Sequence, residues 1–134
     1  MEVYLSLGSN LGDKQVNIDN AILKIEESIG MVKRKSGLYE TEPWGFTSQN
    51  NFVNAAIMIE TSLEPLEILQ QIRKIEKSMG RQLKSQNGKY YDRIIDIDIL
   101  LYGDMTIDLP ELKVPHPLMK ERDFVMKPLN EILG

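Results

Sequence analysis

Cysteine is absent from this 134-residue chain, and histidine occurs once, as His116. The first absence excludes disulfide bonds and thiolate metal sites, and a single histidine argues against a zinc site built on histidines. No hydrophobic run approaches the length of a membrane span. The apolar start at residues 3–7 is too short for a signal peptide and contains the polar Ser6. We therefore expect a cytoplasmic protein without a membrane partner.

Positive charge is outweighed by negative charge, with 16 Lys and Arg against 20 Asp and Glu. Because nucleic-acid binders usually have a basic balance, we expect no nucleic-acid partner. Residues 73–93 are the exception, since seven basic residues there accompany two acidic ones. This local excess favours an anion-binding rim, although a solvated helix face and loop would have the same composition. The length predicts one domain over residues 1–134, and we expect a monomer or weak dimer.

Two aspartates, Asp96 and Asp98, interrupt an isoleucine-rich run over residues 94–102. Such a short apolar run predicts a buried strand, on which Ile95, Ile97, Ile99 and Leu101 face one way and both aspartates face the other. Two like charges on one face of a buried strand are costly without a counter-charge. A divalent cation such as Mg2+ would supply it, while a solvated polar face of the sheet is the alternative.

The remaining periodicities predict an α+β fold of the ferredoxin-like β-α-β-β-α-β type, with an antiparallel sheet and a C-terminal extension. Asp13 is expected to cap the first helix and Pro65 to begin the second. Gly37 is expected to mark a β-bulge within the second strand. The predicted strands are residues 3–7, 31–41, 52–61 and 94–102, the predicted helices follow Asp13 and Pro65, and an amphipathic segment covers residues 124–133.

Short polar and aromatic motifs recur along the whole chain. They include Gly8-Ser9-Asn10-Leu11-Gly12-Asp13, Tyr39-Glu40-Thr41-Glu42-Pro43-Trp44-Gly45, Phe52-Val53-Asn54-Ala55-Ala56, Arg93-Ile94-Ile95-Asp96-Ile97-Asp98, Val114-Pro115-His116-Pro117 and Arg122-Asp123-Phe124. In their order and spacing these motifs resemble the 6-hydroxymethyl-7,8-dihydropterin pyrophosphokinase family of folate-synthesis enzymes. The resemblance implies transfer of an intact pyrophosphoryl group from ATP to the hydroxymethyl oxygen of the pterin, with release of AMP.

The same resemblance implies roles for the charged residues. Asp96 and Asp98 would hold two Mg2+ ions, and Arg81 and Arg93 would approach the triphosphate, so that these four residues form the expected catalytic set. Guanidinium groups pair well with phosphate oxygens and would stabilise charge in the transition state. The residues expected to bind ATP are Glu76, Arg81, Lys84, Lys89, Arg93, Ile99, His116 and Arg122, with the backbone of Ile99 at the adenine.

For the pterin, the resemblance implies an aromatic sandwich between Phe52 and Phe124. Asn54 would pair with the edge of the heterocycle, and Thr41, Pro43 and Trp44 would complete its recognition. Phenylalanines at these positions also fit an ordinary core. An asparagine inside an apolar strand, by contrast, must find polar partners.

The sequence offers three candidates for a general base and does not single one out. His116, Glu76 and Asp96 are each conceivable general bases, so we expect positioning and electrostatic stabilisation to be the main catalytic effects. The chain departs from the family where Lys89-Tyr90-Tyr91-Asp92-Arg93 replaces a basic-Trp-Gly-Pro-Arg pattern. Two rival hypotheses are a nucleotide-binding module without catalysis and a two-metal nuclease or nucleotidyl transferase. A binding module does not need both aspartates, and a nuclease leaves Phe52, Asn54 and Phe124 unexplained.

Overall fold

The structure is a computed structural model that describes residues 1–41, 51–80 and 94–133. The elements follow the order β1 (Glu2–Ser9), α1 (Lys14–Ser28), β2 (Met31–Lys35), β3 (Tyr39–Thr41), β4 (Phe52–Glu60), α2 (Pro65–Ser78), β5 (Asp96–Tyr102), β6 (Ile107–Leu109), β7 (Leu112–Val114), a 3-10 turn (Met119–Glu121) and α3 (Asp123–Leu133). The predicted combination of helices with an antiparallel sheet is confirmed. No helix within the described ranges is long and apolar enough to cross a membrane.

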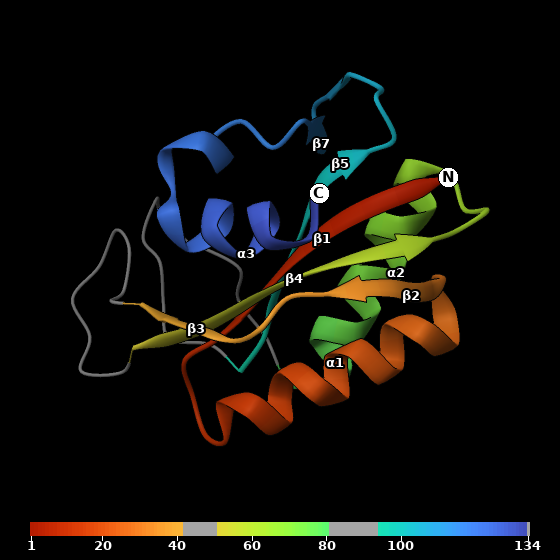
Figure 1. The fold of residues 1–134 in the computed structure, drawn as a ribbon. Helices are drawn as coiled ribbons and strands as arrows, with labels where there is room; N and C mark the ends of the chain where they lie inside the picture. The colour runs from red at the N-terminus through yellow and green to blue at the C-terminus, as the bar shows by residue number, and fades with distance from the viewer. Residues whose placement is uncertain (42–50, 81–93, 134) are drawn as a thin grey trace.

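The main sheet has the strand order β2-β4-β1-β5, and the short strand β3 also pairs with β4 (Figure 1). Every pairing in this sheet is antiparallel. Gly8 on β1 lies opposite Asn54 on β4 and, across its other edge, opposite Asp96 on β5. This register brings the residues that were predicted for the pterin and for metal ions to the same end of the sheet.

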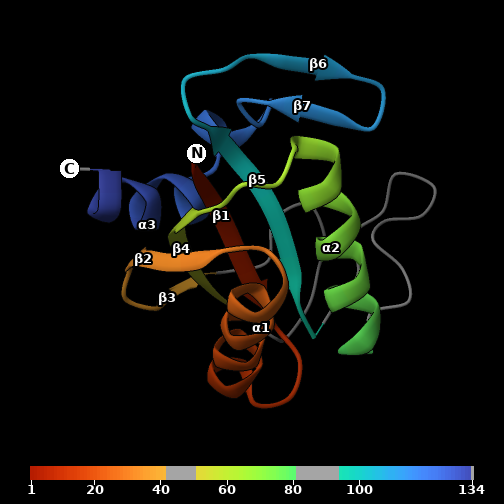
Figure 2. The same cartoon turned by 90° about the vertical axis from the view of Figure 1, so that its right-hand side faces the viewer.

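The two faces of the sheet are covered by different helices. Helices α1 and α2 lie on one face and α3 lies on the other (Figure 2). The core under α1 and α2 contains Leu7, Ile57 and Ile97, whereas the smaller core under α3 contains Ala56 and Leu129. Because side chains alternate along a strand, Asn54, Asp96 and Asp98 lie on the α3 face of the sheet.

Local sequence signals explain where the first two helices begin. The side chain of Asp13 accepts a hydrogen bond from the amide of Val16, as expected for the N-cap of α1. Pro65 occupies the first turn of α2, and Glu64 and Glu67 form a capping box around it. Both predicted helix starts are therefore confirmed.

The strand predicted for residues 31–41 is divided into β2 and β3. The register against β4 shifts by one residue between Val32 and Arg34, and by one more between Lys35, which lies opposite Ile57, and Tyr39, which lies opposite Asn54. The second shift spans Gly37, where an irregularity was expected, but it falls between β2 and β3 rather than inside one strand. Between the two strands, Ser36 Oγ accepts a hydrogen bond from the Ala56 amide at 2.9 Å, and the Gly37 amide donates to the side chain of Glu131. These contacts replace regular strand pairing at the break.

The expected orientation of Leu101 is also wrong. A register shift between Tyr4 and Leu5 puts Leu5 opposite Ile99 and Tyr4 opposite Leu101. The alternation along β5 is thereby interrupted, and Leu101 packs with the core under α3 rather than with Ile99 under α1 and α2.

Candidate active site

The two aspartates of β5 are partly exposed and alternate with the fully buried Ile95 and Ile97. Carboxylate oxygens on one face are the donors that Mg2+ prefers, so Asp96 and Asp98 fit such an ion. Over the described ranges, no group of three or more histidines and acidic residues is arranged to hold a metal. An ion held by this pair would therefore complete its coordination with water or substrate oxygens, which is the usual habit of Mg2+ at phosphate sites.

Glu76, on α2, is buried with 5% of its surface exposed. Its Oε2 accepts a hydrogen bond from the amide of Ile97 at 2.9 Å. Strand β5 is an edge of the main sheet, so this amide has no neighbouring strand on its outer side. Glu76 was predicted to bind ATP. In the structure its carboxylate binds the backbone of β5, the strand that carries Asp96 and Asp98.

Asn54 is buried on β4, and its Nδ2 donates a hydrogen bond to Thr41 Oγ1 at 2.8 Å. One amide N–H is thus engaged by Thr41 on β3, which defines how the amide group is turned. Gly8 lies next to this amide, because a Cβ built on Gly8 would meet Asn54 Oδ1 at 3.0 Å and Phe52 Cδ1 at 3.5 Å. Sequence reasoning missed Gly8, although glycine inside a buried strand often signals such a close approach.

The two phenylalanines predicted to sandwich the pterin come from different elements. Phe52 begins β4 and Phe124 lies in the first turn of α3, and both are partly buried. The guanidinium carbon of Arg122 lies 5.7 Å from the centre of the Phe124 ring, within the range of a cation–π contact. Arg122 is itself buried, with 8% of its surface exposed.

The His116 backbone is tied to β5, since its amide donates to the carbonyl of Leu100 at 3.1 Å. The ring nitrogen Nδ1 accepts a hydrogen bond from the Leu118 amide at 3.3 Å. An Nδ1 that accepts carries no proton, so the proton of the neutral ring is on Nε2. This arrangement makes His116 a hydrogen-bond donor through Nε2.

Six predicted site residues lie outside the described residues: Pro43, Trp44, Arg81, Lys84, Lys89 and Arg93. Ile99 is described, and its side chain belongs to the core under α1 and α2. Its expected contact with adenine uses only the backbone, so a buried side chain is compatible with that expectation.

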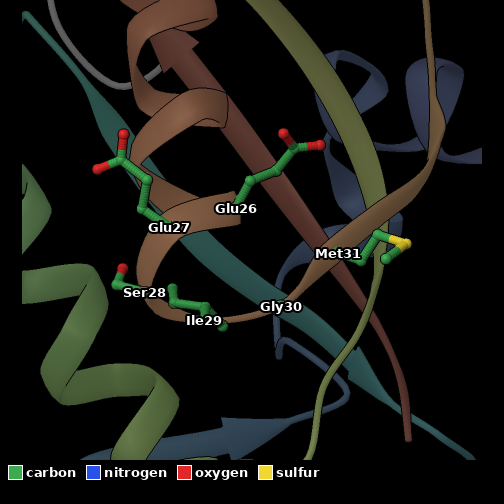
Figure 3. Close-up of a pocket in the computed structure, with 6 residues that line it drawn as sticks. All are labelled: Glu26, Glu27, Ser28, Ile29, Gly30 and Met31. Atoms are coloured by element: carbon green, nitrogen blue, oxygen red, sulfur yellow. The ribbon is translucent and has the colours of Figure 1, made fainter.

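A separate hollow of about 540 Å³ lies at the C-terminal end of α1 (Figure 3). Its lining comes from six consecutive residues: Glu26, Glu27, Ser28, Ile29, Gly30 and Met31. The carboxylates of Glu26 and Glu27 point in different directions, so they do not converge on a common ligand. None of the predicted site residues lines this hollow.

Comparison with known proteins gives a family for the chain. Residues 4–134 match the family described as 7,8-dihydro-6-hydroxymethylpterin-pyrophosphokinase (HPPK). The chain belongs to this family. A 2-amino-4-hydroxy-6-hydroxymethyldihydropteridine pyrophosphokinase of Porphyromonas gingivalis is 46% identical over 131 residues, which cover 97% of this chain and 89% of that protein. Its namesake in Aquifex aeolicus is 48% identical over 130 residues, which cover 97% of this chain and 79% of the relative.

Solved structures give the same fold. A crystal structure of HPPK-DHPS in complex with substrates matches 98% of this chain with a TM-score of 0.78 at 16% identity. Wild-type HPPK-DHPS of Plasmodium falciparum matches 98% with a TM-score of 0.73 at 20% identity. In both cases the chain spans only 40% of the longer HPPK-DHPS chain. At these identities the similarity establishes the fold of the HPPK part alone.

Proposed function

We propose that this chain transfers the pyrophosphoryl group of ATP to the hydroxymethyl oxygen of 6-hydroxymethyl-7,8-dihydropterin, giving AMP and the pterin pyrophosphate. Pyrophosphokinase activity in folate synthesis follows from membership of the family over residues 4–134. The structural observation that carries the proposal is the shared register of Asn54, Gly8 and Asp96 across three neighbouring strands.

This register supports a substrate that reaches from Asn54 to the aspartates. Neighbouring strands are about 4.8 Å apart, so the backbones of Asn54 and Asp96 are separated by roughly 10 Å. Gly8 between them has no side chain that would fill the space above β1. A small planar molecule bound at Asn54 could therefore present its substituent to groups held by Asp96 and Asp98.

The pterin end is suited to a flat heterocycle with a hydrogen-bonding edge. Phe52 and Phe124 would stack on the two faces of the ring, and Asn54 would bind its edge. Because Thr41 already engages one N–H of the Asn54 amide, the amide is oriented before the substrate arrives. Thr41, Pro43 and Trp44 would contribute the remaining contacts of the proposed pterin pocket.

At the phosphate end, Asp96 and Asp98 would hold two Mg2+ ions, which offset the negative charge of the triphosphate when bound. His116 would donate from Nε2 to a phosphate oxygen, and Arg122 would add positive charge nearby. Arg81, Arg93, Lys84 and Lys89 are proposed to bind the remaining phosphate oxygens, and the Ile99 backbone the adenine. Glu76 is proposed to hold β5 in place, so we assign it no proton transfer.

The proposal extends to the type of fold and to the number of domains. We propose that the fold is a ferredoxin-like arrangement over a single domain of residues 1–134, with β3 added between its second and third strands. The strand order β2-β4-β1-β5, flanked by α1 and α2 on one face, supports this arrangement. A monomer or weak dimer in the cytoplasm remains a prediction.

The proposal is tested by incubating the protein with ATP and Mg2+ in parallel with the pterin or with a labelled oligonucleotide. AMP that appears only with the pterin supports the pyrophosphokinase. Cleavage or extension of the oligonucleotide would support the nuclease or nucleotidyl transferase instead. Nucleotide binding without turnover of either substrate would support the binding module.

A further inference from the structure

Glu131, near the C-terminal end of α3, is hydrogen-bonded to the segment that enters β3. The Gly37 amide donates to Glu131 Oε2 at 3.0 Å and to Oε1 at 3.2 Å. The Tyr39 hydroxyl donates to Oε1 at 2.5 Å. One carboxylate therefore holds two residues that are more than ninety positions away in the sequence.

The segment held by Glu131 leads directly to the proposed pterin pocket. On β3, Tyr39 lies opposite Asn54 and Thr41 lies opposite Phe52. Thr41 is also the side chain that accepts the hydrogen bond from Asn54 Nδ2. The position of β3 therefore decides where the Thr41 hydroxyl meets the Asn54 amide.

Helix α3 connects this segment to the opposite side of the pocket. Phe124 and Glu131 are seven residues apart, so they lie about two turns apart, about 10 Å along the helix axis, and on nearly the same face. Between them, Val125 and Leu129 are buried against the sheet in the core under α3. A helix packed in this way fixes the position of Phe124 relative to that of Glu131.

We propose that Glu131 is a positioning residue for pterin binding, because it holds β3 where the Thr41 hydroxyl accepts the hydrogen bond from Asn54. The inference rests on the proposed function, because it assumes that the pterin binds between Phe52 and Phe124 with its edge at Asn54. Hydrogen bonds to a carboxylate are shorter and stronger than neutral ones, and this carboxylate accepts them from both Gly37 and Tyr39. Glu131 itself would touch no substrate.

A second contact at the same end of α3 offers a matched control. Arg34 Nη1 donates to the Ile132 carbonyl at 2.8 Å and ties α3 to β2 rather than to β3. If Glu131 acted only by fastening the helix to the sheet, loss of the Arg34 contact would have the same consequence. If Glu131 acts through β3, loss of its hydrogen bonds weakens pterin binding, whereas loss of the Arg34 contact does not.

The experiment compares Glu131→Gln with Arg34→Met in the full chain. Pterin is titrated calorimetrically in the presence of Mg2+ and a non-hydrolysable ATP analogue, and the analogue is titrated separately. We expect Glu131→Gln to weaken pterin binding roughly three- to tenfold, because the amide keeps one acceptor oxygen but loses the second one and the charge that strengthens both bonds, and to leave the analogue unchanged. We expect Arg34→Met to lower the thermal midpoint without changing pterin affinity.

Tyr39→Phe provides the second test, because it removes one of the donors and keeps the ring. Its effect on pterin binding should be smaller than that of Glu131→Gln, and the double variant should be no weaker than Glu131→Gln alone. Equal pterin affinity in wild type and Glu131→Gln overturns the inference, as does an equal loss in Arg34→Met. A wild-type protein that binds the analogue but not the pterin overturns the proposed function, and the inference with it.

Discussion

The Glu76 carboxylate accepts a hydrogen bond from the Ile97 amide at 2.9 Å, behind the strand that carries both aspartates. Ile97 lies between Asp96 and Asp98, so this bond fixes the backbone at the centre of the proposed metal site. The edge of a sheet otherwise leaves such an amide to water. Here a buried side chain from α2 replaces the missing neighbouring strand.

Replacement of Glu76 by alanine should therefore lower both stability and activity. The loss leaves a buried amide without its acceptor, which costs about 1–3 kcal/mol of unfolding free energy. Glu76→Gln retains an acceptor oxygen and should cost less. Urea unfolding of the two variants measures the difference. Equal stability of Glu76→Ala and wild type would show that the hydrogen bond does not support β5.

Gly8→Ala should weaken pterin binding more than ATP binding. The added Cβ would meet Asn54 Oδ1 at 3.0 Å, which is tighter than an ordinary contact. Asn54 must shift to relieve this contact, and a loss of about 1.4 kcal/mol in pterin binding would raise the pterin KM about tenfold. Steady-state kinetics with each substrate varied in turn measures both KM values. An equal rise in the KM for ATP and in the KM for the pterin would contradict the assigned role of Gly8.

The hydrogen bond to Glu131, with smaller effects of burial and of the carboxylate charge, raises the pKa of the Tyr39 phenol above its ordinary value. A raised pKa on folding contributes stability below the unfolded pKa, and the contribution is lost as pH rises through the folded pKa. Because the ordinary phenol pKa is about 10, the contribution should be constant near neutral pH and should disappear in more alkaline solution. The stability difference between wild type and Tyr39→Phe should therefore shrink above about pH 10. Unfolding by urea across this range measures it, and a difference independent of pH would contradict the assignment.

Local chemistry made much of the fold predictable. The cap at Asp13, the proline at the start of α2 and the isoleucine stripes each follow from interactions within a few residues. The alternation at Asp96 and Asp98 likewise needs only the period of a strand, and the structure has both aspartates on the face opposite Ile97.

The features that the sequence did not reveal depend on contacts between distant segments. Leu101 changes faces because β1 and β5 shift register, which neither strand shows by itself. The strand over residues 31–41 breaks where Gly37 meets Glu131, a partner 94 positions away. The roles of Gly8 and Glu76 require knowledge of which strand and helix lie beside them.

Product analysis by mass spectrometry separates pyrophosphoryl transfer from every other use of ATP by this protein. Wild-type protein is mixed with ATP, Mg2+ and 6-hydroxymethyl-7,8-dihydropterin, beside Asp96→Asn and Asp98→Asn variants whose folding is checked by circular dichroism. We expect the wild type to form AMP and pterin pyrophosphate in equal amounts. Either folded variant should form them at least about 100-fold more slowly, since even outer partners of metal ligands contribute up to that factor. Formation of ADP, or variants as fast as wild type, would contradict the proposed function.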